Sequence, residues 1–123
     1  MINLKGKKIL ITGATGGIGG ALVKKFVSLE ASVLATGTNT EKLDNLKKDY
    51  PNINVLKFDI SDHKKIEEFI ENVSSQLTGL DILVNNAGIN MDNISLRMSE
   101  DEWKKVIDIN LTSTFLLSKY AIK

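Results

Sequence analysis

The sequence predicts an α/β fold, a doubly wound parallel sheet of about four strands with helices between them. Short apolar runs alternate along the 123 residues with longer stretches whose apolar residues recur at helical spacing. Such short apolar strands are typical of a parallel sheet that is covered on both faces. A hydrophobic share of 42% and a charged share of 25% fit one compact globular domain. Right-handed crossovers between the strands then give the doubly wound arrangement.

The first half of the chain shows this alternation clearly. Lys8–Thr12 is a short apolar run that ends in glycines, which predicts a buried strand. The next helix is expected over Ile18–Leu29, with one apolar face made of Ile18, Leu22, Phe26 and Leu29. A second strand follows at Ser32–Ala35, and a polar helix at Glu41–Tyr50 has a narrow apolar stripe of Leu43 and Leu46. Pro51 closes that helix, because proline disfavours helical conformation in the residue before it.

The second half repeats the pattern. Asn54–Phe58 is the third expected strand and Asp81–Val84 the fourth. Between them, Asp62–Leu77 is expected to be an amphipathic helix whose inward residues are Ile66, Phe69, Ile70, Val73 and Leu77. A last helix starts after Ser99, where Glu102 completes a capping box, and runs to the end of the chain. That helix is still apolar at its end and the fourth strand would be an open edge, so we expect the chain to be part of a longer one.

Composition excludes several classes of function. A net charge of +1 predicts neither a nucleic-acid partner nor a membrane partner. The chain has no cysteine, which excludes disulfides, thiolate metal sites and a cysteine nucleophile. No signal peptide or membrane-spanning segment is recognisable at the N-terminus, so a cytoplasmic location is expected. The single His63 lies in a polar stretch without neighbouring metal ligands, so no metal site is expected.

A glycine-rich loop, Thr12 to Gly19, lies between the first strand and the first helix. Gly13 permits a tight turn, Gly17 lets backbone approach a pyrophosphate, and Gly19 removes a side chain where helix meets strand. The helix N-terminus offers N–H groups to phosphates. The loop therefore predicts dinucleotide binding in a Rossmann-type domain. A nucleoside-triphosphate loop would need Gly-Lys followed by Ser or Thr, which is absent here, and a methyltransferase loop fits the later motifs poorly.

The spacing Thr-Gly-x-x-x-Gly-x-Gly resembles that of the short-chain dehydrogenase/reductase family. Three further motifs agree with the family in order and distance, namely Asp59-Ile60, Asn85-Asn86-Ala87-Gly88 and Asn110-Leu111. The resemblance covers essentially the whole chain and implies a nicotinamide cofactor. It implies the following cofactor-binding residues: Gly13, Ala14, Thr15, Gly16, Gly17, Ile18, Gly19, Thr38, Asp59, Ile60, Asn86, Ala87 and Gly88.

The resemblance also gives these residues roles. Asp59 is similar to the acid that accepts a hydrogen bond from the adenine amino group, with Ile60 beside it. Alternatively, Asp59 could be an acid at the start of the next helix, although Ser61 or Asp62 could cap that helix instead. Asn86, Ala87 and Gly88 are similar to the backbone shelf along the ribose. The asparagine before them, Asn85, resembles one that ties neighbouring strands. Asn110 resembles the helix asparagine that holds a water in the family's proton relay.

Residues after the second strand bear on the choice of cofactor. NAD-binding forms carry an Asp or Glu there to hold the ribose 2′-hydroxyl. The stretch from Ala35 to Asn39 has no acid, and Thr38 could donate a hydrogen bond to a 2′-phosphate. NADPH is therefore expected rather than NADH.

The segment from Asn90 to Trp103 resembles the 3-oxoacyl-acyl-carrier-protein reductases of fatty-acid synthesis, most of all at Asp92-Asn93 and Arg97-Met98. The resemblance implies that the complete protein reduces a 3-oxoacyl thioester on acyl carrier protein to the 3-hydroxyacyl thioester, and that it is a homotetramer. Another short-chain dehydrogenase acting on a small ketone or alcohol, or a dinucleotide-binding module without catalysis, are the alternatives.

The family's catalytic serine and Tyr-x-x-x-Lys pair are not identifiable in the 123 residues. Tyr120 and Lys123 are three residues apart rather than four, so Tyr120 is expected to be a packing or interface residue. The chain is thus expected to be the N-terminal part, residues 1–123, of a single NAD(P)-binding domain whose catalytic C-terminal part is absent. By itself it is expected to bind cofactor without turnover.

Overall fold

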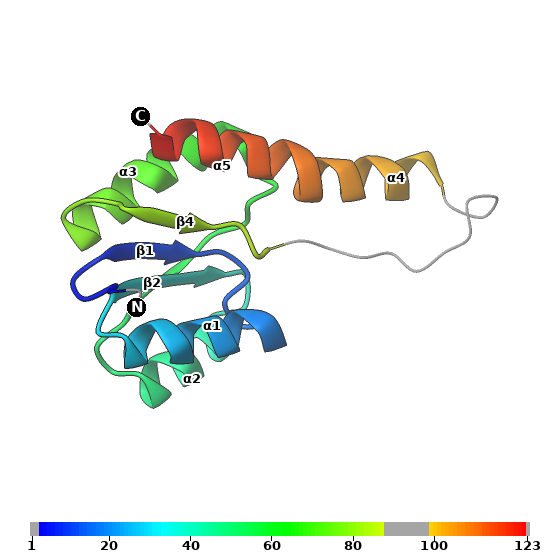
Figure 1. Cartoon of the computed structure of the whole chain (residues 1–123). Helices are drawn as coiled ribbons and strands as arrows, with labels where there is room; N and C mark the ends of the chain where they lie inside the picture. The colour runs from blue at the N-terminus through cyan, green and yellow to red at the C-terminus, as the bar shows by residue number, and fades with distance from the viewer. Residues whose placement is uncertain (1–2, 88–98, 123) are drawn as a thin grey trace.

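A computed structural model describes residues 3–87 and 99–122. Its centre is a parallel sheet of four strands in the order β3-β2-β1-β4, which confirms the predicted doubly wound α/β fold (Figure 1). The register pairs Leu10 of β1 with Leu34 of β2 on one side and with Leu83 of β4 on the other. The elements are β1 (Lys8–Ile11), α1 (Gly17–Ser28), β2 (Ser32–Gly37), α2 (Thr40–Asp49), β3 (Asn54–Lys57), η1 (His63–Lys65), α3 (Ile66–Leu77), β4 (Ile82–Val84), α4 (Glu100–Ile107), η2 (Asp108–Thr112) and α5 (Ser113–Ile122).

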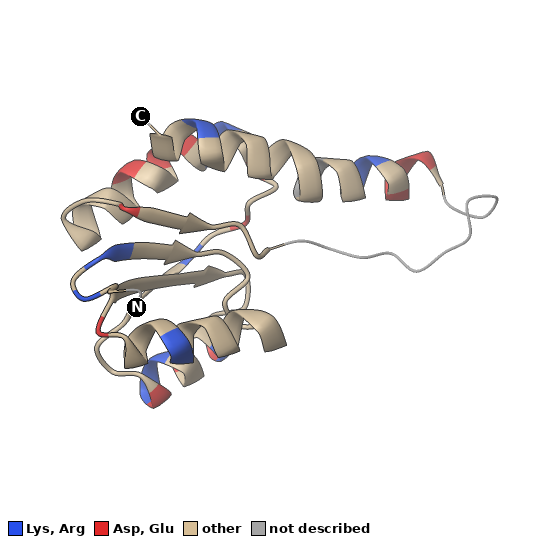
Figure 2. Cartoon of the chain, viewed as in Figure 1, with Lys and Arg blue, Asp and Glu red and all other residues tan. Residues whose placement is uncertain are grey.

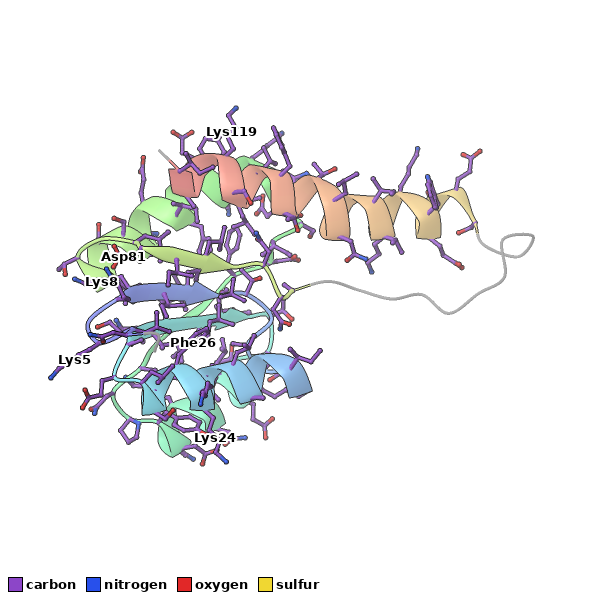
Figure 3. The ribbon with its side chains drawn as sticks, viewed as in Figure 1. Lys5, Lys8, Lys24, Phe26, Asp81 and Lys119 are labelled. Atoms are coloured by element: carbon purple, nitrogen blue, oxygen red, sulfur yellow. The ribbon has the colours of Figure 1, made fainter. Side chains whose placement is uncertain are left out.

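Two apolar cores lie on opposite faces of the sheet, because alternate residues of a strand point to opposite faces. Leu10 and Leu34 pack with α3 and α5 on one face, where the predicted inward residues of α3 are all buried. Ile9, Ile11 and their β2 neighbours pack with α1 and α2 on the other face. Figure 1 shows these two helical layers above and below the strands, and Figure 3 shows Phe26 pointing from α1 toward the sheet.

The first turn of α1 corrects one sequence prediction. Ile18 was expected on the inward face, but its side chain is 72% exposed. The inward positions of α1 are Gly19 and Val23, with Leu22 and Phe26 packed against the same core. The first turn of α1, which contains Ile18, extends past the ends of the strands in Figure 1.

The C-terminal helix has its predicted course but contains one irregular turn. Ser99 does cap it, because the Ser99 hydroxyl oxygen accepts a hydrogen bond from the Glu102 N–H at 3.1 Å. The helix is continuous from Glu100 to Ile122, as predicted, but it contains the π-helical turn η2 between α4 and α5. Several large apolar residues of this helix are exposed, among them Trp103 (59%), Leu111 (62%) and Phe115 (62%). Among the described residues, no helix has the length and apolar character needed to span a membrane.

Candidate functional site

Four loops meet at the carboxyl edge of the sheet, where the strands end. The chain leaves β1 for β2 and β3 on one side and returns to β4 on the other side of β1. The strand order therefore reverses between β1 and β4, and ligands of open α/β sheets bind at such a reversal. The loop after β1 is the glycine-rich segment that the sequence singled out. In Figure 2 neither this loop nor the first turns of α1 carry the colours of charged residues.

Thr12 joins the glycine-rich loop to the loop after β4. Its side chain is buried, and its hydroxyl donates a hydrogen bond to the Val84 carbonyl at 3.3 Å. The same oxygen accepts hydrogen bonds from the backbone N–H groups of Asn86 at 3.0 Å and Ala87 at 2.9 Å. Sequence reasoning placed Thr12 at the start of the loop but gave it no role. A hydroxyl at the end of an otherwise apolar strand was the available signal, because a buried hydroxyl needs a partner.

Gly13 fits closely against the loop after β4. Its φ of +61° lies in the left-handed region, as expected for the tight turn that was predicted. A Cβ atom at this position would lie 2.7 Å from the Ala87 Cα, so any side chain would collide with the neighbouring backbone. The Asn86 side chain donates a hydrogen bond to the Gly13 carbonyl at 3.0 Å. Gly13 therefore serves the turn and the contact between the two loops together.

Gly19 and Gly17 have opposite surroundings. A Cβ at Gly19 would lie 2.2 Å from the Gly13 carbonyl oxygen and 2.7 Å from the Ala14 Cα. The glycine thus lets α1 rest on the loop itself, rather than on the strand as the sequence suggested. At Gly17 a Cβ would have no atom within 4 Å. Nothing in the described part of the chain requires a glycine there, whereas a ligand lying on the backbone would.

The N-terminus of α1 has no capping side chain. Gly16 is its N-cap residue, no side chain among the described residues makes a capping hydrogen bond there, and the first turn contains no acid. The N-terminus of α2 differs, because the Asn39 side chain accepts a hydrogen bond from the Lys42 N–H at 3.0 Å. The first N–H groups of a helix have no partner within the helix and favour an anion. The start of α1 is therefore suited to a phosphate group.

The end of β2 lies beside the glycine-rich loop. A Cβ at Gly37 would lie 3.4 Å from the Thr15 hydroxyl oxygen, so these two segments are in contact. Thr38 follows Gly37 and is exposed, and Asn39 caps α2. The structure thus places Gly37, the residue before the predicted Thr38, against the predicted Thr15.

Asp59 and Ile60, which follow β3, face in different directions. Asp59 is exposed, and its Oδ1 accepts hydrogen bonds from the Ser61 hydroxyl at 2.7 Å and the Ser61 N–H at 2.9 Å. These two bonds lower the pKa of Asp59 from its usual value, and the charge of Lys105 lowers it further. Ile60 is buried in the core shared with α3. Only Asp59 of this pair has its side chain at the surface.

The two asparagines after β4 make different side-chain contacts. The Asn85 side chain donates a hydrogen bond to the Ser118 hydroxyl of α5 at 3.2 Å. The Asn86 side chain links the loop after β4 to the loop after β1, through the Gly13 carbonyl. Ala87 adjoins Gly13, as described above. Gly88 and the segment from Asn90 to Met98 lie outside the described residues.

Asn110 lies within the π-helical turn η2 and is exposed. The sequence predicted it inside a regular α-helix. π-helical turns are rare and occur frequently at functional sites, because the wider turn interrupts the regular backbone hydrogen bonding. A polar residue at such a turn is well suited to hold a water molecule.

Two other residues considered from the sequence have structural surroundings. Tyr120 packs against the core between the sheet and α3, as a packing residue should. The His63 ring nitrogen Nε2 lies 3.0 Å from the Ser113 hydroxyl oxygen. Among residues 3–87 and 99–122, no three His, Asp or Glu side chains are grouped so that they could hold a metal ion.

Comparisons with known proteins agree with this geometry. A family model described as short chain dehydrogenase matches residues 7–123. Among similar sequences, the 3-oxoacyl-acyl-carrier-protein reductases FabG of Rickettsia conorii and Aquifex aeolicus are 44% and 35% identical over 100% and 99% of this chain. The chain spans about half the length of these relatives, 50% and 51%.

Solved structures give the same result for the fold. A short-chain dehydrogenase/reductase from Brucella melitensis, described as glucose/ribitol dehydrogenase, has a TM-score of 0.91 and 31% identity. The match covers 98% of this chain and 52% of that one. A short-chain dehydrogenase/reductase of Serratia marcescens has a TM-score of 0.90 and 26% identity, with 98% and 51% covered.

Proposed function

The chain belongs to the short-chain dehydrogenase family, and from this premise we propose that it is the cofactor-holding part of an NADPH-dependent oxidoreductase. In this proposal residues 1–123 form the N-terminal part of one NAD(P)-binding domain, and the complete protein carries the catalytic part as well. The complete protein reduces a 3-oxoacyl thioester on acyl carrier protein to the 3-hydroxyacyl thioester in the cytoplasm. The relatives named 3-oxoacyl-acyl-carrier-protein reductase support this substrate.

The observation that carries the proposal is the uncapped start of α1 over an open Gly17. A pyrophosphate is a small dianionic group that needs N–H donors and close access to backbone. The first turn of α1 offers both, and it has no acidic side chain that would repel the group. Residues Gly13 to Gly19 would therefore hold the pyrophosphate of the cofactor.

The adenosine end of the cofactor would lie over the ends of β2 and β3. Thr38 would donate a hydrogen bond to the 2′-phosphate of NADPH, since no acid in this loop would hold the 2′-hydroxyl of NADH. Asp59 would accept a hydrogen bond from the adenine amino group, with Ile60 behind it. The lowered pKa of Asp59 keeps its carboxylate in the accepting form at neutral pH.

The nicotinamide end would lie toward the loop after β4. Asn86, Ala87 and Gly88 would line the ribose, and Asn110 in η2 would hold a water of the proton relay. When bound, the cofactor supplies the hydride that the carbonyl carbon of the substrate accepts. The oxygen of that carbonyl needs a proton from an acid, and the family's Tyr-x-x-x-Lys pattern does not occur in these 123 residues. The chain alone is therefore proposed to bind cofactor without turnover.

A homotetramer of the complete protein is part of the proposal. Trp103, Leu111 and Phe115 are large apolar side chains exposed along α4, η2 and α5. Exposed apolar stripes of this kind mark protein interfaces. Sedimentation of the complete protein and of its Phe115→Lys variant tests this. The unaltered protein is expected to sediment as a tetramer, and the lysine charge in the variant is expected to dissociate it.

Calorimetric titration of the chain with NADPH and, separately, with NADH tests the cofactor site. NADPH is expected to bind more tightly than NADH, and tighter binding of NADH would overturn the assignment of Thr38. An assay with an acetoacetyl thioester and NADPH tests the second half of the proposal. No oxidation of NADPH above the background rate is expected from the chain alone, whereas turnover would contradict a purely cofactor-holding role.

A dinucleotide-binding module without catalysis is the second candidate, because the chain contains no Tyr-x-x-x-Lys pattern. The same acetoacetyl thioester assay, carried out on the complete protein, separates the two candidates. Reduction of the thioester would identify the complete protein as an enzyme, whereas binding of NADPH without reduction would identify it as a binding module. A small ketone or alcohol included as a competing substrate tests whether another short-chain dehydrogenase activity is present instead.

A further inference from the structure

A buried serine on α5 connects two segments that are distant in the sequence. Ser113 has no exposed surface, and its hydroxyl donates a hydrogen bond to the Ile60 carbonyl at 2.6 Å. The Nε2 atom of His63, which belongs to η1, lies 3.0 Å from the same hydroxyl oxygen. Ser113 thus contacts the backbone just after Asp59 and the ring of the short helix that follows.

The direction of these bonds fixes the protonation of the histidine ring. A serine hydroxyl has one proton, and Ser113 gives it to Ile60, because a carbonyl oxygen can only accept. The Ser113 oxygen must then accept from His63, so Nε2 carries a hydrogen. A neutral ring in this arrangement is the Nε2–H tautomer, with Nδ1 unprotonated.

The three groups lie at a junction of the proposed site. Ile60 directly follows Asp59, whose carboxylate is expected to face the adenine. Ser113 is the first residue of α5 and directly follows the π-helical turn that contains Asn110. A loop whose backbone carbonyl is bonded to a packed helix has fewer conformations than one that is bonded only to itself. The hydrogen bonds therefore restrict the corner that presents Asp59.

We propose that His63 and Ser113 are positioning residues, which hold the corner formed by Asp59 and Ile60 against α5 and so set the adenine-binding wall. This inference rests on the proposed function, because it takes the site of the adenine from there. It assigns no contact between His63 or Ser113 and the cofactor. Their effect reaches the ligand through the backbone at Ile60.

The first test needs no ligand. Nitrogen-15 NMR of the histidine ring in the whole chain is expected to show Nε2 as the protonated, pyrrole-type nitrogen at a pH where the ring is neutral. The Ser113→Ala variant is expected to lose this preference, and Ser113→Thr is expected to keep it. A ring protonated on Nδ1 in the unaltered chain would overturn the proposed pair.

The second test separates positioning from general destabilisation. Two probes are titrated into each variant: adenosine diphosphate, which carries adenine and pyrophosphate, and inorganic pyrophosphate, which reaches only the glycine-rich loop. His63→Leu removes the donor, whereas His63→Gln keeps an N–H at the end of a side chain. Lys64→Leu is the matched control, because Lys64 is the exposed neighbour on the same short helix. Ser75→Ala, at an exposed position of α3, is the control for Ser113→Ala.

The expected results differ between the probes. His63→Leu and Ser113→Ala should weaken adenosine diphosphate binding by about five-fold, the equivalent of one net hydrogen bond. Binding of pyrophosphate should stay within about two-fold, and His63→Gln should restore most of the loss. Unchanged binding of adenosine diphosphate, or an equal loss for both probes, would overturn the positioning role. Failure of the unaltered chain to bind either probe would instead overturn the proposed cofactor site, while the NMR result still decides whether the pair exists.

Discussion

A methyl group at Gly19 tests whether this glycine is required for the folding of the chain or for the binding of a ligand. In Gly19→Ala the new Cβ would lie 2.2 Å from the Gly13 carbonyl oxygen, about 0.8 Å inside the 3.0 Å limit that real Cβ atoms respect. It would also lie 2.7 Å from the Ala14 Cα. Both obstacles are backbone atoms, so neither can rotate away as a side chain would. The loop and the helix must move apart.

The size of the effect follows from two opposing contributions. Overpacking of this kind costs about 1–3 kcal/mol. Replacing glycine with alanine in a helix returns up to about 1 kcal/mol, because the unfolded chain loses freedom. The free energy of unfolding should therefore fall by about 1–2 kcal/mol, which lowers the Tm of a chain of this size by roughly 4–10 °C.

Gly17→Ala is the matched comparison, because a Cβ there has no atom within 4 Å and Gly17 is the first residue of the same helix. This variant should be as stable as the unaltered chain or slightly more stable. Its affinity for NADPH should nevertheless fall by about ten-fold, since the methyl group occupies space that a pyrophosphate needs, at a cost near 1.4 kcal/mol.

Thermal unfolding by circular dichroism and NADPH titration of both variants provide the measurements. The reasoning is refuted if Gly19→Ala is as stable as the unaltered chain, because the contact with Gly13 would then be easily relieved. It is equally refuted if Gly17→Ala binds NADPH normally, because the open side of Gly17 would then not face the cofactor.

Three further predictions concern the edge of the sheet. Thr12→Val should lower the free energy of unfolding by about 1–3 kcal/mol in urea, because the Ala87 N–H loses its acceptor, and Thr12→Ser should recover it. Ser61→Ala should be less stable than the unaltered chain at pH 7, because the Ser61 hydroxyl stabilises the Asp59 carboxylate and lowers its pKa. This difference in the free energy of unfolding should shrink as the pH falls below about 4, where the carboxylate becomes protonated. A difference that stays constant with pH would contradict this. Thr38→Asp should reverse the preference from NADPH to NADH in paired titrations, because the carboxylate repels a 2′-phosphate and accepts a bond from a 2′-hydroxyl.

The sequence predicted best where residues are buried by the sheet itself. All four strands were placed within two residues of their observed ends. The central strands β1 and β2 are mostly buried, and a strand covered on both faces is mainly apolar. The five inward residues predicted for α3 are all buried. A helix that lies along a sheet over its whole length keeps one apolar face, and the helical period identifies that face.

Prediction failed where the deciding contact is distant in the sequence or where a helix leaves the sheet. Ile18 has the correct spacing for the inward face of α1, but spacing does not reveal where the sheet ends beneath the helix. The π-helical turn that contains Asn110 could not be predicted from the sequence. The spacing of apolar residues in this helix is too irregular to distinguish an α-helical from a π-helical turn. The bond between Asn86 and Gly13 joins residues 73 positions apart, and a local pattern has no means of pairing them.

These distant bonds explain why the candidate site can be rigid without a ligand. Thr12 fixes the loop after β4, Asn86 and Ala87 fix Gly13, and Gly19 lets α1 rest on that turn. A loop held in this way is already fixed before a cofactor binds. Less of the binding free energy is therefore lost to the conformational entropy of ordering the loop. Gly17 is the exception, because a Cβ there would meet no atom of the described residues within 4 Å. Gly13 and Gly19 are thus explained by the fold alone, whereas an open glycine at the uncapped start of a helix is explained by a ligand that approaches the backbone there.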